Sequence, residues 1–187
     1  MDLHIIIECY IDTKLIKALV PPRTKYNHQH GCPKVVKVMQ DNFKDDFSVG
    51  IIDRDKKELG YVNEFDLVIE APNILQLLKH RNKNHYLIFI CPAVEKWIIS
   101  CALDAGILLS DYGLPNDFRS LMKITKKSTD ENDDPYSSNI KELFKALKTE
   151  NPTKVAVLIF WIEYLKANPY QADLDFISSE TLRILGN

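Results

Sequence analysis

The sequence predicts an α/β fold, in which a mostly parallel sheet is flanked by helices and is followed by a helical C-terminal portion. Three short apolar runs, over residues 3–7, 47–52 and 86–91, are typical of buried strands, and each is followed closely by an acidic residue or proline. Apolar residues at helical spacing fill most of the remaining chain. No strand pattern follows residue 92, which places the sheet in the first half.

The first strand and helix form a β-turn-α unit. The run over residues 3–7 ends at Glu8. Either Asp12 or Thr13 is expected to cap a helix whose apolar stripe ends at Val20, because a short polar side chain satisfies the first helical N–H groups. Pro21 and Pro22 then end the helix.

The middle of the sheet region is less regular. Residues 23–33 look like a loop, and residues 35–43 favour a second amphipathic helix, with a strand as the alternative. Residues 47–52 and 86–91 are the second and third expected strands. The intervening segment 64–80 is ambiguous, although Ile74, Leu75, Leu77 and Leu78 favour a helix.

The second half is expected to be helical, with helices around residues 94–105, 140–147 and 155–162. Residues 155–162 are apolar on every helical face, so this helix is expected to be central to a helical cluster or covered by a partner. The polar, acidic segment 128–135 is expected to be a loop or linker. We therefore expect an α/β domain over residues 1–105 and a helical extension over residues 106–187.

Composition limits the function. The 187 residues carry 24 Lys+Arg and 26 Asp+Glu, a formal net charge of -2, so any nucleic-acid contact must be local. No GxxxxGK[ST] motif indicates an ATPase. The four cysteines lack CxxC spacing, and the first residues do not resemble a signal peptide, which favours a cytoplasmic protein. The longest apolar run is too short for a membrane helix, so no membrane association is expected.

Acidic residues follow the three predicted strands. Glu8, Asp53 with Asp55, and Glu95 each lie at or just beyond a strand's carboxyl end. Because parallel strands place these ends at one sheet edge, the four carboxylates are expected to converge there and to hold Mg²⁺ or Mn²⁺. The alternative is structural, since strand ends are often polar and the helix dipole alone favours Glu95 at a helix N-terminus.

These motifs resemble the TOPRIM family of topoisomerases, bacterial primases and OLD-type nucleases. The family pattern is an apolar strand ended by Glu, matched here by residues 5–12, and a second strand ended by Asp-x-Asp, matched by residues 49–55. A weaker match, over residues 91–97, is to small TOPRIM-like proteins of phage-defence systems. The resemblance covers roughly residues 3–100 and implies a Rossmann-like sheet. Cys9 stands where the family usually has glycine.

The resemblance also implies roles. Glu8, Asp53 and Asp55 would be catalytic and would hold the metal, and Glu95 would be an accessory ligand. On the substrate side, we expect phosphate contacts from Lys56, Lys57 and His30 and a contribution from Asp12. Together these roles describe a Mg²⁺-dependent nuclease or related phosphoryl-transfer enzyme, acting in phage defence or DNA repair. The chain is too short for the further domains of a topoisomerase or primase. We therefore expect a homo-oligomer, an ATPase or another partner protein to supply part of the substrate-binding surface.

Three alternatives remain open. His28, His30 and Cys32 offer Zn²⁺ ligands in one loop, but a fourth ligand at recognisable spacing is missing. Asp53-Arg54-Asp55 also resembles the aspartyl nucleophile motif of haloacid-dehalogenase-type phosphatases, although its downstream acidic pair is missing. The functional rival is a non-catalytic TOPRIM-like module that binds a partner protein or nucleotide through its helical half.

Overall fold

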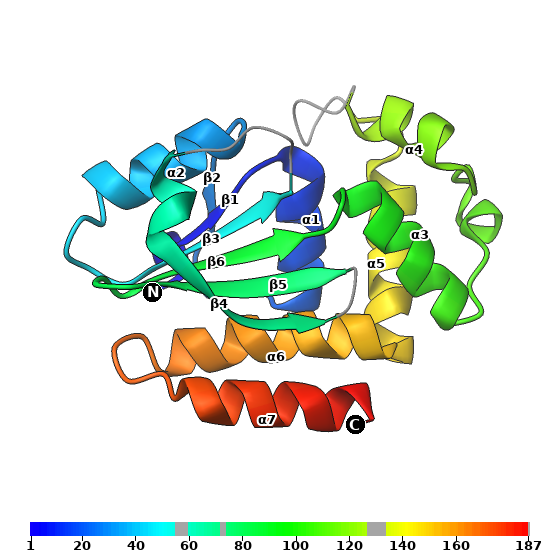
Figure 1. Ribbon diagram of the computed structural model, residues 1–187. Coiled ribbons are helices and arrows are strands. Elements are labelled where there is room, and N and C mark those ends of the chain that lie inside the picture. Colours follow the sequence, from blue (N-terminus) through cyan, green and yellow to red (C-terminus); the bar gives the residue numbers. More distant parts are fainter. Residues whose placement is uncertain (55–59, 72–73, 127–133, 187) are drawn as a thin grey trace.

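The parallel strands expected from the sequence lie side by side at the centre of one mixed sheet (Figure 1). The computed structural model describes residues 1–54, 60–71, 74–126 and 134–186. Within these residues the strand order is β2-β1-β3-β6-β5-β4. The strands are β1 (Ile5–Ile7), β2 (Asn27–His28), β3 (Ser48–Asp53), β4 (Phe65–Ala71), β5 (Leu75–His80) and β6 (His85–Ile90).

The sheet has a parallel half and an antiparallel half. Strands β2, β1, β3 and β6 pair in parallel, whereas β4, β5 and β6 pair antiparallel. The α/β class and the three expected strands are confirmed. Strand β2 is a two-residue addition inside the segment expected to be a loop.

The helix favoured within residues 64–80 was wrong, because the described part of this segment forms β4 and β5. Leu75, Gln76 and Leu77 are all buried, since both faces of β5 are covered. The spacing of Ile74, Leu75, Leu77 and Leu78 also fits one face of a helix, so sequence alone does not separate a short buried strand from a helix here.

The helices expected near residues 35–43, 94–105, 140–147 and 155–162 are confirmed. The first helix begins at Tyr10 with Cys9 as its N-cap residue, so the expected cap at Asp12 or Thr13 was wrong. Asp12 lies inside the first turn, where its carboxylate accepts a hydrogen bond from the Cys9 thiol and does not cap the helix. The helices are α1 (Tyr10–Leu19), α2 (Cys32–Asp41), α3 (Val94–Asp104), α4 (Phe118–Thr125), α5 (Ser137–Glu150), α6 (Thr153–Ala167) and α7 (Leu174–Leu185), with short 3₁₀ helices at Asp2–His4, Gly60–Glu64 and Leu109–Tyr112.

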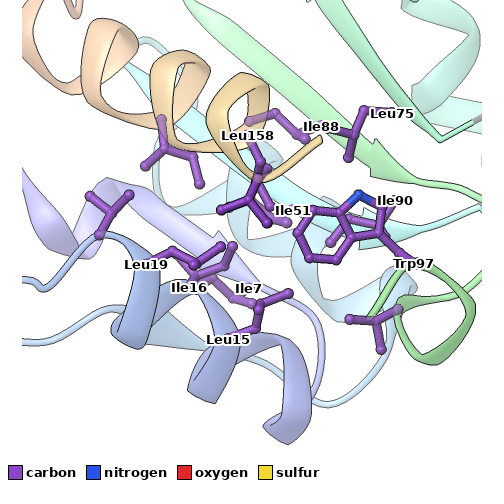
Figure 2. Packing of buried hydrophobic residues seen from close by; sticks show 14 of the residues in the cluster. Ile7, Leu15, Ile16, Leu19, Ile51, Leu75, Ile88, Ile90, Trp97 and Leu158 are labelled. Atoms are coloured by element: carbon purple, nitrogen blue, oxygen red, sulfur yellow. The ribbon is translucent and has the colours of Figure 1, made fainter. Parts of the chain in front are cut away.

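Alternate strand residues pack into two hydrophobic clusters. On one face, Ile7, Ile51 and Ile88 pack with side chains of α1, α3, α5 and α6, as Figure 2 shows in part. On the other face, Ile6 and Leu87 pack against α2 and the 3₁₀ helix Gly60–Glu64. The larger cluster joins the sheet to helices from both halves of the chain, so the C-terminal helices share their core with the sheet.

Helix α6 is apolar on every face because it has partners on more than one side. Its buried residues belong to the sheet cluster, and α7 packs along it (Figure 1). The Trp161 indole N–H donates to the Thr181 hydroxyl of α7 over 2.8 Å, and Phe160 contacts the Phe176 ring. The expected burial of this helix is therefore confirmed. Among the described residues, no helix has the length and apolar character needed to cross a membrane.

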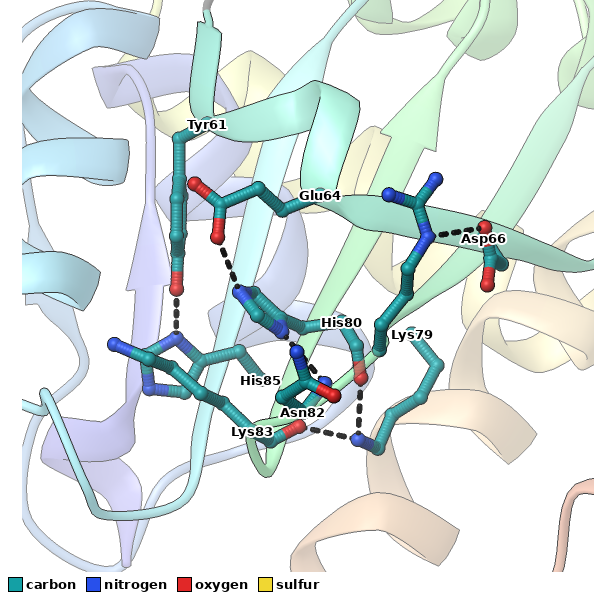
Figure 3. Close-up of polar contacts among 9 residues, drawn as sticks. Tyr61, Glu64, Asp66, Lys79, His80, Asn82, Lys83 and His85 are labelled. Atoms are coloured by element: carbon teal, nitrogen blue, oxygen red, sulfur yellow. Dashed lines mark hydrogen bonds and ion pairs between the residues drawn. The ribbon is translucent and has the colours of Figure 1, made fainter.

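Two buried histidines connect β5 and β6 with the 3₁₀ helix Gly60–Glu64 (Figure 3). The Tyr61 hydroxyl lies 2.5 Å from His85 Nδ1, and His80 Nε2 lies 3.0 Å from the Glu64 carboxylate. The sequence assigned these histidines no role. His80 ends β5 and His85 begins β6, so both lie away from the carboxyl ends of the parallel strands.

Candidate functional site

The carboxyl ends of β1, β3 and β6 bring three of the expected acidic residues to one edge of the sheet. Glu8 follows β1, Asp53 ends β3, and Glu95 lies in the first turn of α3, just beyond β6. The register is fixed by parallel pairing, which places Ile7 beside Ile51 and Asp53 beside Ile90. The fold thus gathers residues from distant parts of the chain.

Hydrogen bonds hold two of these carboxylates in place. The backbone N–H of Asp53 donates to Glu8 Oε2 over 2.9 Å. Asp53 Oδ1 in turn accepts the backbone N–H of Val94 over 3.0 Å, at the start of α3. An N-terminal helical N–H favours an anionic partner, so this contact stabilises the ionised Asp53 carboxylate.

Glu95 is buried and is oriented from a different helix. The Thr125 hydroxyl, at the end of α4, donates to Glu95 Oε1 over 2.5 Å. Sequence reasoning missed Thr125. A single threonine thirty residues away carries no local pattern, and the contact arises only because α3 and α4 pack together.

Asp12, in the first turn of α1, is buried, with only 1% of its surface exposed. Its Oδ2 accepts the Cys9 thiol hydrogen over 3.0 Å, whereas its buried Oδ1 has no hydrogen-bond partner in the described structure. Burial and then the charges of Glu8 and Glu95 raise the pKa of Asp12 to about 7, although hydrogen bonds from Cys9 oppose this shift. This buried oxygen leaves a strong acceptor unsatisfied.

The pKa of Asp53 is raised as well. Burial raises the pKa of Asp53 to about 9, with further contributions from the charges of Asp12, Glu8 and Glu95, and the Val94 N–H opposes the shift. Burial also raises the pKa of the Cys9 thiol, followed by the neighbouring Asp12 charge. Buried carboxylates whose pKa values are raised by burial and by neighbouring negative charges are typical of functional sites.

A cavity of about 600 Å³ opens above the strand ends. Glu8, Asp53 and Glu95 lie in its lining, as do three basic residues, Arg54, Lys126 and His30. Helix α4 supplies one wall through Met122, Thr125 and Lys126. The cavity therefore combines hard carboxylate oxygens with cationic groups in a space suited to a small ligand.

Comparisons with protein-family models, with curated proteins and with solved structures found no match. The TOPRIM resemblance therefore rests on the sequence motifs and remains a proposal.

Three expected site residues, Asp55, Lys56 and Lys57, lie outside the described residues. The expected loop at 128–135 lies outside them as well, except for Asp134 and Pro135. Asp134 is buried and forms a 2.6 Å ion pair with Lys14 of α1.

The loop histidines do not form the zinc site weighed above. His28 Nδ1 lies 2.9 Å from the Thr13 hydroxyl, and the His28 and His30 rings meet edge to face with centroids 4.7 Å apart. Among the described residues, no three His, Cys, Asp or Glu side chains are gathered closely enough to hold a metal ion. His30 instead extends to the cavity.

The carboxylates at the sheet edge are candidate ligands for a divalent cation. The donor chemistry fits Mg²⁺ or Mn²⁺, because both prefer oxygen ligands and the orphaned Asp12 Oδ1 adds a buried acceptor. As placed, however, the described carboxylates do not converge on one point. Binding a cation at this edge therefore requires side-chain rotation around a fixed backbone frame.

Proposed function

We propose that the protein is a Mg²⁺- or Mn²⁺-dependent phosphoryl-transfer enzyme that hydrolyses phosphodiester bonds. The observation that carries this proposal is the placement of three carboxylates, Glu8, Asp53 and Glu95, at the carboxyl ends of β1, β3 and β6, together with the buried Asp12 in the first turn of α1. They lie beside a cavity that also presents Arg54 and Lys126. Carboxylates that can bind a metal ion and cationic side chains that can contact phosphate oxygens are the groups that a metal-bound phosphate ester requires.

The cost of this arrangement supports a functional origin. Burying several carboxylates together is unfavourable unless protons or a cation neutralise them. A stable scaffold would gain by replacing Asp12 with an apolar or amide side chain, whose burial carries no charge penalty. Retaining charge at such a cost is common where a site must bind or react.

Each residue of the site has a defined part in the proposed reaction. Glu8, Asp53 and Glu95 would hold the cation, and the TOPRIM resemblance adds Asp55. A divalent cation supplies charge neutralisation on phosphate oxygens and activates water. The Val94 N–H keeps Asp53 oriented, the Thr125 hydroxyl keeps Glu95 oriented, and the Glu8 carboxylate is suited to accept or return a proton.

A second candidate is a non-catalytic TOPRIM-like module that binds a partner protein or nucleotide. Two observations favour it: the described carboxylates do not yet converge on a metal, and Cys9 stands where the family usually has glycine. In this case the site would retain ligand binding without turnover.

A cleavage assay separates these candidates. Purified protein is incubated with single- and double-stranded DNA and RNA, with Mn²⁺, with Mg²⁺ or with EDTA. We expect cleavage only with the divalent ions, and at least about 100-fold slower cleavage by Asp53→Asn, because a ligand and its charge are lost. Glu142→Gln, on the exposed face of α5, is the matched control. Cleavage that survives in Asp53→Asn, or no cleavage of any substrate, contradicts the enzymatic proposal.

A further inference from the structure

The cavity above the strand ends has a feature that the carboxylates do not explain: a wall supplied by the C-terminal half of the chain. Met122, Thr125 and Lys126 of α4 face the same space as Glu8 and Asp53. Thr125 is anchored to Glu95, so this wall is tied directly to the acidic residues. The site is therefore a hollow and not a flat surface.

The charges in this hollow are divided between two kinds of element. Carboxylates come from the strand ends and the start of α3, whereas cationic side chains come from Arg54, after β3, and Lys126, at the end of α4. Both cationic residues are exposed, so they are accessible to a ligand. Once a divalent cation offsets the charge of the carboxylates, Arg54 and Lys126 favour the binding of an anion. A phosphate ester is such an anion.

The dimensions and remaining lining argue for a small ligand. A volume of about 600 Å³ falls within the usual range for small-molecule sites, roughly 300–1,000 Å³. Tyr10, Pro92 and Met122, which are partly or fully exposed, add aromatic and apolar surface to the lining, against which a nucleobase or sugar can pack. Duplex nucleic acid instead requires a basic surface that follows many phosphates, and a chain of net charge -2 offers only local cationic groups.

We propose that this cavity binds a single nucleotide-sized phosphate ester, either a free nucleotide or the end of a single strand, with Arg54 and Lys126 contacting its phosphate oxygens. This inference rests on the proposed function, because it names the substrate class of the same site. It makes α4 a determinant of specificity, with Lys126 as a binding residue and Thr125 as the positioning residue of Glu95. Duplex recognition is not expected from this chain.

The test measures binding without turnover. Adenosine 5′-monophosphate is titrated into the 187-residue protein in Ca²⁺ by calorimetry, with inorganic phosphate and a short DNA duplex as competitors. Arg54→Gln and Lys126→Gln are expected to weaken nucleotide binding by about tenfold or more, because each removes one charge-assisted contact. Lys123→Gln is the matched control, since Lys123 is exposed on the same helix but does not line the cavity.

The outcomes separate this inference from the enzymatic proposal. Nucleotide binding that is stronger than phosphate binding, and that falls in both cavity variants but not in Lys123→Gln, supports the inference even if no cleavage is found. Equal affinity for phosphate and nucleotide, unchanged binding in the cavity variants, or preferential binding of the duplex overturns it. Metal-dependent cleavage without nucleotide binding overturns the inference and leaves the enzymatic proposal standing.

Discussion

The backbone N–H of Asp53 donates a hydrogen bond to Glu8 Oε2 over 2.9 Å, which joins the ends of β1 and β3. Glu8 therefore has two separable properties: an acceptor oxygen that fastens neighbouring strand ends, and a negative charge at the sheet edge. A neutral side chain of the same shape keeps the acceptor oxygen and removes the negative charge.

Glu8→Gln is expected to keep the fold and lose cation binding. The amide oxygen can still accept the Asp53 N–H, so the free energy of unfolding should stay within about 1 kcal/mol of the wild type. Glu8→Ala leaves that N–H unsatisfied and should cost about 1–3 kcal/mol. Urea unfolding measures stability, and Mn²⁺ titration should show at least about tenfold weaker binding for both variants. Equal destabilisation by Gln and Ala would show that the charge, and not the hydrogen bond, fastens the strands.

Asp12→Asn is expected to stabilise the protein at alkaline pH. The folded-state pKa of Asp12, about 7, lies above its unfolded value of 3.8, so the native state binds a proton that the unfolded state releases. Stability from this group is present below pH 3.8 and is lost as pH rises through 7. Asn removes that loss, which at pH 9 is on the order of 4 kcal/mol.

The measurement is the free energy of unfolding of wild type and Asp12→Asn at pH 5 and pH 9 in EDTA. The gain from Asn should be larger at pH 9 than at pH 5. Asp41→Asn, an exposed change at the end of α2, should show no such pH-dependent gain. A gain of the same size at both pH values would mean that Asp12 carries no shifted titration.

The sequence was sufficient to locate Glu8 and Asp53 because the end of a buried strand is a local signal and parallel strands share an edge. It was not sufficient for Thr125, Lys126 or Arg54, whose place at the cavity depends on how α4 packs on α3 and on the direction of the chain after β3. These contacts are set by tertiary packing and have no period of their own.

The difference between local sequence signals and tertiary packing also explains why a helix was favoured where the structure has β4 and β5. Helices α2, α3 and α6 have clear apolar patterns and were predicted, whereas β4 and β5 were not. In β5 the apolar residues Leu75, Leu77 and Leu78 fit a helical face as well as a strand, and the polar Gln76 is nevertheless buried because both faces of β5 are covered. The antiparallel half of the sheet therefore emerges only from pairing with β6.

Gly50→Ala is expected to destabilise the central strand β3. A Cβ at this position would lie 2.7 Å from Leu87 Cδ2 and 2.8 Å from Met39 Sδ, so α2 and β6 would have to move. Such overpacking typically costs about 1–3 kcal/mol. Urea unfolding should show this loss, whereas Gly60→Ala, with no atom within 4 Å of the added carbon, should show little change. Equal effects at the two glycines would mean that packing around Gly50 relaxes without cost.

His85→Gln is expected to reduce the loss of stability on acidification. His85 Nε2 lies 2.8 Å from the Phe43 carbonyl oxygen and must donate to it, so the neutral ring offers Nδ1 as an acceptor for the Tyr61 hydroxyl. Burial lowers the pKa of His85 below 6.5, and burial likewise lowers the pKa of His80, although Glu64 opposes that shift. The unfolded state thus binds protons first, and stability falls as pH drops below 6.5.

Glutamine can place its amide near Nε2 and keep the donor to Phe43, but it leaves the Tyr61 hydroxyl without its acceptor. The variant should therefore be about 1 kcal/mol less stable than wild type at pH 7.5. Between pH 7.5 and pH 5 it should lose less stability than wild type, because one buried proton acceptor is gone. Lys37→Gln, an exposed change on α2, is the control and should keep the wild-type difference between the two pH values. Parallel profiles for wild type and His85→Gln would show that the buried imidazole does not contribute to acid sensitivity.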